Sequence, residues 1–485
     1  QARAYAAPGH GFTVRTPPPA SERDARRWAR RALMNGAGGL WWQRAYGTAA
    51  EGTRGSAVLP DARPDPIFGA LIEEVRRLAP LAGLLAAGTP PPPAILIWDD
   101  AGNRLLSHAA TREAPTQRTA VAHGLALCAP LNVPHALLDP RDDAALQPAA
   151  ILLLPGARAL SEASLERVRN FVTAGGIVVA DHLPGTHDGH GTPRHVSPLA
   201  ALFGVAQEAF TPERNAGELG YQSPYAHITG GIGTVRHNTA LASTGAVAHG
   251  RAGETPLWLA HSTGAGMTLL LNHDLPGTAD EAAFRAVQAL LAGLARQAGT
   301  APKVALEEPP GPGATLYSRS AKLGSAHVMA LWRPGDEGPR TLRTRLTRPE
   351  GHTLYAPETR ESSARGAGYR IALPRDALAW YTALPYAVDA MALRTPETQV
   401  RGQRLPFSVV LEADATPSAP HPVDVWLATL DGAPTPGLRT RLTLGEGRGA
   451  GYLMLPRTLP IGPYLVHARD QLTGLTESQP ITVEP

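Results

Sequence analysis

Histidine and aspartate side chains gather in the segment 181–195, where their types are suited to binding a metal ion. Imidazole and carboxylate groups together favour Zn²⁺ or a similar ion. The segment follows the apolar run Ile177-Val178-Val179-Ala180, and the carboxyl end of a parallel strand is where α/β proteins place ligands. The sequence therefore predicts a zinc site with His182, His187 and His190 as ligands.

The same segment has a simpler interpretation as a polar surface loop. It also contains Asp181, Asp188 and His195, and it is rich in glycine and proline. The spacing of its histidines matches no established metal motif, and the chain carries no phosphate-binding loop of the Walker type. Zinc is therefore the only cofactor that the sequence suggests.

A second group, Trp41, Trp42, Gln43 and Arg44, has the composition of a carbohydrate-binding site. Aromatic faces stack on the CH surfaces of sugars, and glutamine and arginine donate hydrogen bonds to hydroxyl groups. The alternative is that both tryptophans belong to a core.

Nucleophilic chemistry finds little support in the sequence. Cys128, the only cysteine, falls late in a predicted helix over residues 116–129, whereas a nucleophilic cysteine requires a tight turn between strand and helix. We expect Cys128 to pack in a core. Adjacent carboxylates such as Glu73 and Glu74 diverge on a helix, so no catalytic acid pair is predicted.

The elements that position these residues begin with a helix over residues 21–35, a strand over 40–42, and a helix from Ile67 to Ala79 that Pro80 should end or kink. Four consecutive prolines, Pro90 to Pro93, then predict a stiff linker.

Beyond the linker, apolar strands alternate with helices, which indicates a parallel sheet covered on both faces. Residues 206–247 are predicted to be irregular. A strand pair over 257–260 and 267–272 and a helix over 281–298 complete this region. After Lys303, short alternating segments separated by turns predict two β domains.

Composition excludes several classes of protein. The 485 residues are 43% hydrophobic and 18% charged, the balance of a multidomain globular protein. A formal charge of only +3, with no basic run interleaved with aromatics, argues against nucleic acid as a partner. No apolar stretch approaches the roughly 18 residues of a membrane span. The sequence does not determine the cellular compartment, although it slightly favours an extracellular or periplasmic location.

Several stretches together resemble the β-galactosidases of glycoside hydrolase family 42. Residues 28–51, with the run from Asn35 to Arg44, are similar to the last strand and helix of that family's (β/α)₈ barrel. The run Ile151-Leu152-Leu153-Leu154-Pro155-Gly156 and residues 269–275 are similar to its trimerisation domain, which has a glutamine-amidotransferase-like fold. Residues 462–474 are similar to the closing strands of an immunoglobulin-like domain.

The resemblance implies four parts. These are a partial (β/α)₈-barrel remnant (1–88), a flavodoxin-like, glutamine-amidotransferase-like α/β domain (93–300), a β-sandwich (303–384) and an Ig-like domain (385–485). It places residues 41–44 at a barrel strand end, where such enzymes contact substrate. By resemblance both catalytic carboxylates precede Gln1, so no catalytic residue is assigned within the chain.

The predicted function follows from that arrangement. We expect the structural and oligomerisation portion of a family 42-like glycosidase, a homo-oligomer and by resemblance a trimer, inactive unless a missing barrel segment or another chain completes it. A non-catalytic extracellular carbohydrate-binding or scaffold protein is the alternative, and an amidotransferase-like enzyme is disfavoured by Cys128. An incomplete barrel leaves open strand edges, so residues 1–88 must pack on the rest of a longer precursor, a second polypeptide or the domain that directly follows them.

Overall fold

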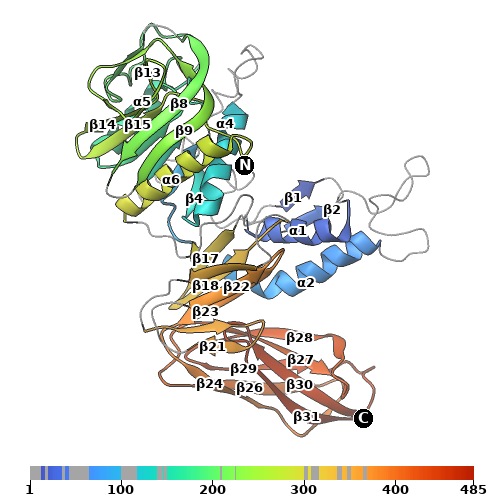
Figure 1. Cartoon of the computed structure of the whole chain (residues 1–485). Helices are drawn as coiled ribbons and strands as arrows, with labels where there is room; N and C mark the ends of the chain where they lie inside the picture. The colour runs from blue at the N-terminus through green and yellow to red at the C-terminus, as the bar shows by residue number, and fades with distance from the viewer. Residues whose placement is uncertain are drawn as a thin grey trace, which may run out of the picture. The chain divides into compact units, whose positions relative to one another are not determined.

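The chain forms two compact units in the computed structural model (Figure 1). The α/β unit lies within residues 92–302, and the helix–sandwich unit combines residues 9–91 with 303–485. The structure describes residues 13–16, 20–34, 39–42, 65–99, 117–138, 146, 150–207, 210–223, 226–299, 304–306, 316–335, 341–346, 351–363 and 369–485.

The α/β unit is built on a seven-stranded sheet in the order β11-β14-β15-β6-β5-β3-β4. Five neighbouring strands run parallel, and β14 and β11 extend the sheet in antiparallel pairing. The strands are β3 (Ile95–Trp98), β4 (His135–Leu138), β5 (Ile151–Leu154), β6 (Ile177–Ala180), β11 (Val247–Ala248), β14 (Trp258–Thr263) and β15 (Gly266–Leu271).

Both faces of this sheet are covered, as its continuous apolar strands predict. Along β5, Ile151 and Leu153 join one core and Leu152 and Leu154 join the other, because successive strand residues face opposite sides. Residues of α4 (Gln117–Cys128) and α6 (Glu281–Gln297) fill the first core, and α5 (Glu162–Thr173) fills the second. The hydroxyl of Ser161 caps α5 by accepting the Ser164 N–H at 3.1 Å.

The prediction that residues 206–247 are irregular is wrong. They contain a long antiparallel hairpin, β8 (Pro212–Gln222) and β9 (His227–Asn238), in a four-stranded sheet with β12 (Gly250–Ala252) and β13 (Thr255–Pro256). A smaller pair joins β7 (Val205–Gln207) to β10 (Leu241–Ser243). The hairpin is rich in glycine and exposes one face, so its apolar residues are too sparse for the strand pattern to be recognised.

Four sheets form the two β domains of the helix–sandwich unit, in agreement with the predicted pattern. Their strand orders are β16-β19-β22 and β17-β18-β23-β20-β21, then β24-β26-β29 and β25-β31-β30-β27-β28. The strands of the first two sheets are β16 (Val304–Leu306), β17 (Tyr317–Leu323), β18 (Ala326–Trp332), β19 (Thr341–Leu346), β20 (Thr353–Ala356), β21 (Glu361–Ser363), β22 (Tyr369–Pro374) and β23 (Leu378–Leu384). Those of the last two are β24 (Val388–Arg394), β25 (Thr398–Val400), β26 (Arg404–Ala413), β27 (His421–Ala428), β28 (Pro434–Leu444), β29 (Arg448–Met454), β30 (Gly462–Asp470) and β31 (Thr476–Glu484).

The N-terminal part of this unit is a βαβα segment. It consists of β1 (Thr13–Thr16), α1 (Glu22–Met34), β2 (Gly39–Trp42) and α2 (Pro66–Ala87), with β1 and β2 paired in parallel. The strand β1 was not predicted from the sequence. A parallel pair joined by a helix is the repeating unit of a (β/α)₈ barrel, so the described segment has the form expected of a barrel remnant.

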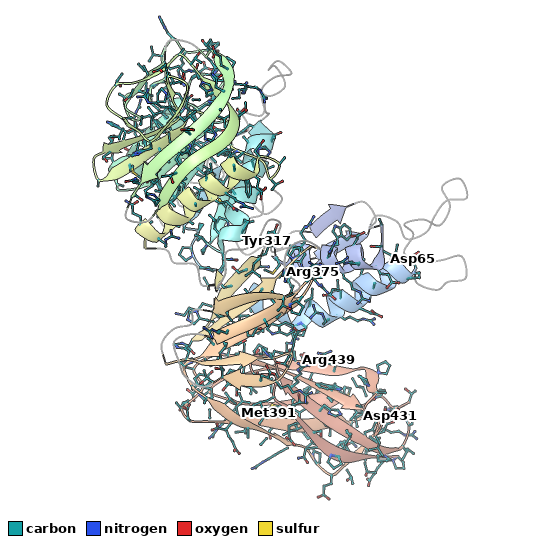
Figure 2. The ribbon with its side chains drawn as sticks, in the orientation of Figure 1. Asp65, Tyr317, Arg375, Met391, Asp431 and Arg439 are labelled. Carbon is teal, nitrogen blue, oxygen red and sulfur yellow. The ribbon has the colours of Figure 1, made fainter. Side chains whose placement is uncertain are left out.

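The predicted end of the second helix at Ala79 is wrong. Asp65 begins α2, as Figure 2 shows, by accepting the Ile67 N–H at 2.8 Å, and the helix continues through Pro80 to Ala87. Proline removes one backbone hydrogen bond. The buried leucines Leu81 and Leu84 beyond it provide the packing that keeps the last turns helical.

Both N-terminal helices pack on the first β domain. Buried residues of α1 and α2, among them Leu33 and Leu81, share one core with Val328 and Trp332 of β18. The described helices therefore pack on a domain of the same chain that comes after the α/β domain, whereas the prediction named the domain directly after residue 88. Within the described residues, no helix combines the length and apolarity required to cross a bilayer.

Candidate functional site

The tryptophans proposed to contact sugar lie at the end of β2. In the parallel pairing of these two strands, Trp41 and Trp42 lie opposite Arg15 and Thr16 of β1. Gln43 and Arg44 lie outside the described residues. A carbohydrate contact at this strand end therefore stays a prediction.

A cavity of about 320 Å³ lies in the α/β unit at the carboxyl end of β6. Its walls combine basic, imidazole and apolar side chains, with no carboxylate among the described residues that line it. The lining residues are Arg158, His182, Leu183, Thr186, His187, Pro193, Arg194, His195, Ser197, Gln207 and Phe210. The carboxyl edge of the sheet is where a ligand site of an α/β fold is expected.

Asp274 organises one side of this region. It follows β15 and accepts two hydrogen bonds from Arg236 of β9, at 2.9 and 3.1 Å, and one from His182 Nε2 at 3.0 Å. Burial raises the pKa of Asp274, but these hydrogen bonds and the charges of both partners outweigh it and hold the pKa well below its usual range. The carboxylate is therefore ionised and fixes the orientation of the His182 ring.

His182 is buried and only half satisfied. Its Nε2 is committed to Asp274, and its Nδ1 has no hydrogen-bond partner among the described residues. Its ring meets Phe210 edge to face at a centroid distance of 5.4 Å. The neighbouring Asp181 accepts the Gly156 N–H at 2.8 Å, and burial raises the pKa of the Asp181 carboxyl.

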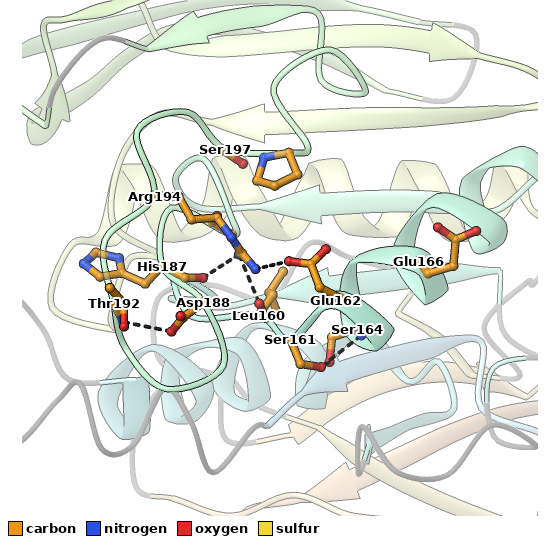
Figure 3. A network of polar contacts seen from close by, with 12 residues as sticks. Leu160, Ser161, Glu162, Ser164, Glu166, His187, Asp188, Thr192, Arg194 and Ser197 are labelled. Atoms are coloured by element: carbon orange, nitrogen blue, oxygen red, sulfur yellow. Dashed lines mark hydrogen bonds and ion pairs between the residues drawn. The ribbon is translucent and has the colours of Figure 1, made fainter.

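Arg194 shapes the loop that forms the opposite wall (Figure 3). Its Nη1 donates to the carbonyl oxygens of Leu160, Gly185 and His187, and its Nη2 donates to Glu162 at 2.6 Å. These four bonds consume most of the donors of the Arg194 guanidinium. Arg194 therefore acts as a structural organiser of the loop.

Three further hydrogen bonds close the loop. Asp188 accepts the backbone N–H groups of His190 and Thr192, each at 2.9 Å. Ser197 donates to the carbonyl oxygen of Pro184 at 2.5 Å. The carboxylate of Asp188 is thus hydrogen-bonded to backbone N–H groups of the predicted polar loop and holds the loop in one conformation.

The three histidines predicted as zinc ligands are not brought together. His182 and His187 line the cavity, but His190 is exposed and is not part of its wall. In the part of the chain that the structure describes, no group of three or more His, Cys, Asp or Glu side chains is placed to hold a metal ion. Sequence proximity within a loop does not by itself make side chains converge on a metal ion.

Cys128 is buried at the end of α4, as predicted. Burial raises the pKa of its thiol to about 12, so the nucleophilic thiolate is not formed near neutral pH. This environment removes the basis for an amidotransferase-like mechanism at Cys128.

A second polar constellation, in the Ig-like region, has catalytic residue types but no access. His421 Nδ1 lies 3.0 Å from Asp470 Oδ2, Thr473 donates its hydroxyl to the same oxygen at 2.6 Å, and Tyr386 lies 2.8 Å from His421 Nε2. All four side chains are buried, so no substrate reaches them. They link strands and turns within the helix–sandwich unit.

Sequence reasoning missed the residues that define the cavity chemically. Arg236 lies in the hairpin predicted to be irregular, and Phe210 and Arg158 lie in loops without a recognised motif. Asp274 follows an apolar strand directly, and that position was the one available signal. Its arginine partner comes from 38 residues away and was not predictable.

Comparison with solved structures shows what the fold is similar to. A β-galactosidase from Bacillus circulans sp. alkalophilus matches with a TM-score of 0.60 at 15% identity, covering 75% of this chain and 52% of that one. A β-galactosidase from Rahnella sp. R3 gives 0.59 at 17% identity, with 75% and 51% covered. A catalytic mutant of a family 42 β-galactosidase from G. stearothermophilus gives 0.57 at 16%, with 75% and 50% covered.

These matches establish a fold shared with the family 42 β-galactosidases, as the sequence resemblance predicted. The chain spans about half the length of the structures it matches. No protein-family model and no curated protein matches the sequence.

Proposed function

We propose that this chain is the structural and assembly portion of a glycoside-hydrolase-like protein, and that hydrolysis of β-galactosides requires barrel strands beyond those described. The observation that carries the proposal is the fold shared with family 42 β-galactosidases over 75% of the chain, at about half of their length. In a homo-oligomer, a trimer by resemblance, the α/β unit would supply the contacts between copies.

The way the barrel-type helices are held supports this role. Arg27 of α1 binds both carboxylate oxygens of Asp376, at 2.7 and 2.8 Å, and Arg23 binds the same side chain at 2.7 Å. Asp376 lies in the turn between β22 and β23. The first β domain therefore provides a built platform for barrel-type elements.

A second set of ion pairs joins α1 to α2 and connects α2 to the turn between β20 and β21. The buried Glu74 of α2 accepts hydrogen bonds from Arg30 at 2.8 Å and from Arg77 at 2.7 Å, and Arg77 also binds Glu358. Burial raises the pKa of Glu74, but both arginines outweigh it and hold the pKa below its usual value. Glu74 and Glu358 both bind Arg77, so each carboxylate serves as an ion-pair partner. A retaining glycosidase instead requires two carboxylates about 5 Å apart on either side of an open sugar site.

The test is an assay with a nitrophenyl β-galactoside. The chain alone should be silent, and activity should appear when a polypeptide that supplies the preceding barrel strands is added. An Asp376→Asn chain should complement less well, and an Asp389→Asn chain, altered at an exposed aspartate of β24, should complement like the wild type. Hydrolysis by the pure chain would contradict the proposal. Silence in every mixture would favour a carbohydrate-binding or scaffold protein.

Oligomeric state gives a second test of the assembly role. Light scattering should detect a homo-oligomer of the isolated chain, with three copies if the resemblance extends to assembly. A monomer at micromolar concentration would count against this part of the proposal.

A further inference from the structure

We propose that the cavity at the carboxyl end of β6 binds a small molecule through an oxyanion, a carboxylate or a phosphate, with Arg158 as the anchoring cation. This inference rests on the α/β unit alone and is independent of the glycosidase proposal. It is supported by the residues of the cavity wall, by the unpaired charge of Arg158, and by the His182 Nδ1 atom, which has no hydrogen-bond partner among the described residues.

The charge of Arg158 is not paired with a carboxylate by any contact among the described residues. Among the described residues, no side-chain hydrogen bond or ion pair engages its guanidinium, in contrast to Arg194 and Arg236 beside it. Burial lowers the pKa of Arg158, and the charge of Asp181 only partly offsets this effect. An unpaired and largely desolvated guanidinium is costly unless a ligand supplies the missing acceptor.

Phe210 presents the Arg158 guanidinium for such a contact. The Arg158 Cζ atom lies 4.6 Å from the centre of the Phe210 ring, in a cation–π arrangement. A cation–π contact uses no N–H donor, so the donors of the Arg158 guanidinium stay available to a ligand. Those donors have the spacing to bind a carboxylate or a phosphate with two parallel hydrogen bonds.

The rest of the wall favours an anion over the metal cation predicted from sequence. Burial lowers the pKa of His187, and the charges of Arg158 and Arg194 lower it further against the opposing charge of Asp188, so two guanidinium groups act on this ring. A divalent cation would meet the same repulsion. With its Nε2–H donated to Asp274, His182 has a buried Nδ1 without a partner among the described residues, and this atom can donate to a bound oxyanion when the ring carries both protons.

The experiment is isothermal titration calorimetry with charged and neutral probes, in which galacturonate and galactose share one sugar ring and differ in charge. The wild-type chain should bind galacturonate or inorganic phosphate with saturable heat and should bind galactose much more weakly. A preference between the two anions identifies the source of the oxyanion. Binding of galactose as strong as that of galacturonate, or no heat with either anion, would overturn the proposal.

Variants of Arg158 test whether this residue is the cation that anchors the anion. Arg158→Gln should weaken anion binding at least tenfold, and Arg158→Lys, which keeps the charge but loses the planar fork, should weaken it less. Arg285→Gln, at an exposed arginine of α6 paired with Glu281, is the matched control and should bind like the wild type. Unchanged affinity in a folded Arg158→Gln chain would refute the assignment. Should that chain fail to fold, the galacturonate and galactose comparison on the wild type still decides.

Discussion

Replacing Asp376 with asparagine should loosen the docking of α1 on the first β domain. Asp376 has a positive φ of 57°, a conformation that asparagine tolerates as well as aspartate, so the turn keeps its shape. The change removes the negative charge that Arg23 and Arg27 share, and it leaves a single oxygen acceptor. The variant therefore isolates the ion-pair contribution from the backbone contribution.

The magnitude follows from the exposure of these groups. Breaking a buried ion pair costs roughly 3–5 kcal/mol, and an exposed pair contributes about 0–1 kcal/mol. The side chain of Asp376 is 17% exposed, that of Arg27 is 22% exposed and that of Arg23 is 52% exposed, which places the set between the two limits. We expect a loss of about 2 kcal/mol, or roughly 30-fold in the equilibrium for helix detachment.

Hydrogen exchange of the α1 backbone amides measures that equilibrium directly. At pH 7 the amides of Asp376→Asn should exchange roughly 30-fold faster than those of the wild type, whereas Asp389→Asn should change nothing. Burial raises the pKa of Asp376, but the two arginines outweigh it and hold the pKa below its usual value. The stabilisation is therefore present above the unfolded pKa of about 4 and is lost as the pH falls through the lower, folded pKa.

Two results would refute this reasoning. One is a difference between Asp376→Asn and the wild type of less than threefold at pH 7. The other is a difference that stays constant as the pH falls from 5 to 3, because protonation of Asp376 should make the two chains alike.

Two further predictions concern buried groups. Tyr386→Phe removes the hydroxyl that lies 2.8 Å from His421 Nε2 and accepts the Ala419 N–H. It should therefore lower the free energy of unfolding, measured by urea titration, by about 1–3 kcal/mol. A change below about 0.3 kcal/mol would contradict the role of this network. Burial raises the pKa of Cys128 to about 12, so iodoacetamide at pH 8 should label the urea-unfolded chain but not the native one, and rapid labelling of the native protein would show that the thiol is accessible.

The sequence by itself determined the elements whose signals are local. The helix cap at Ser161, the apolar run of β5, the helical position of Cys128 and the change to β structure after Lys303 were all read from neighbouring residues. Periodicity and capping act over a few residues, so one stretch of chain contains the whole signal. The resemblance to family 42 galactosidases also followed from such stretches, and the fold comparison confirmed it.

Only the tertiary structure decided which side chains meet. The hairpin of β8 and β9 was missed because a glycine-rich strand with one exposed face carries little local pattern. The continuation of α2 through Pro80 depends on packing partners more than 200 residues away. Arg236 reaches Asp274 and Arg158 reaches Phe210 because separate loops converge at one sheet edge. Such convergence depends on the path of the whole chain, and loop composition alone therefore suggested a metal site where the assembled wall is cationic.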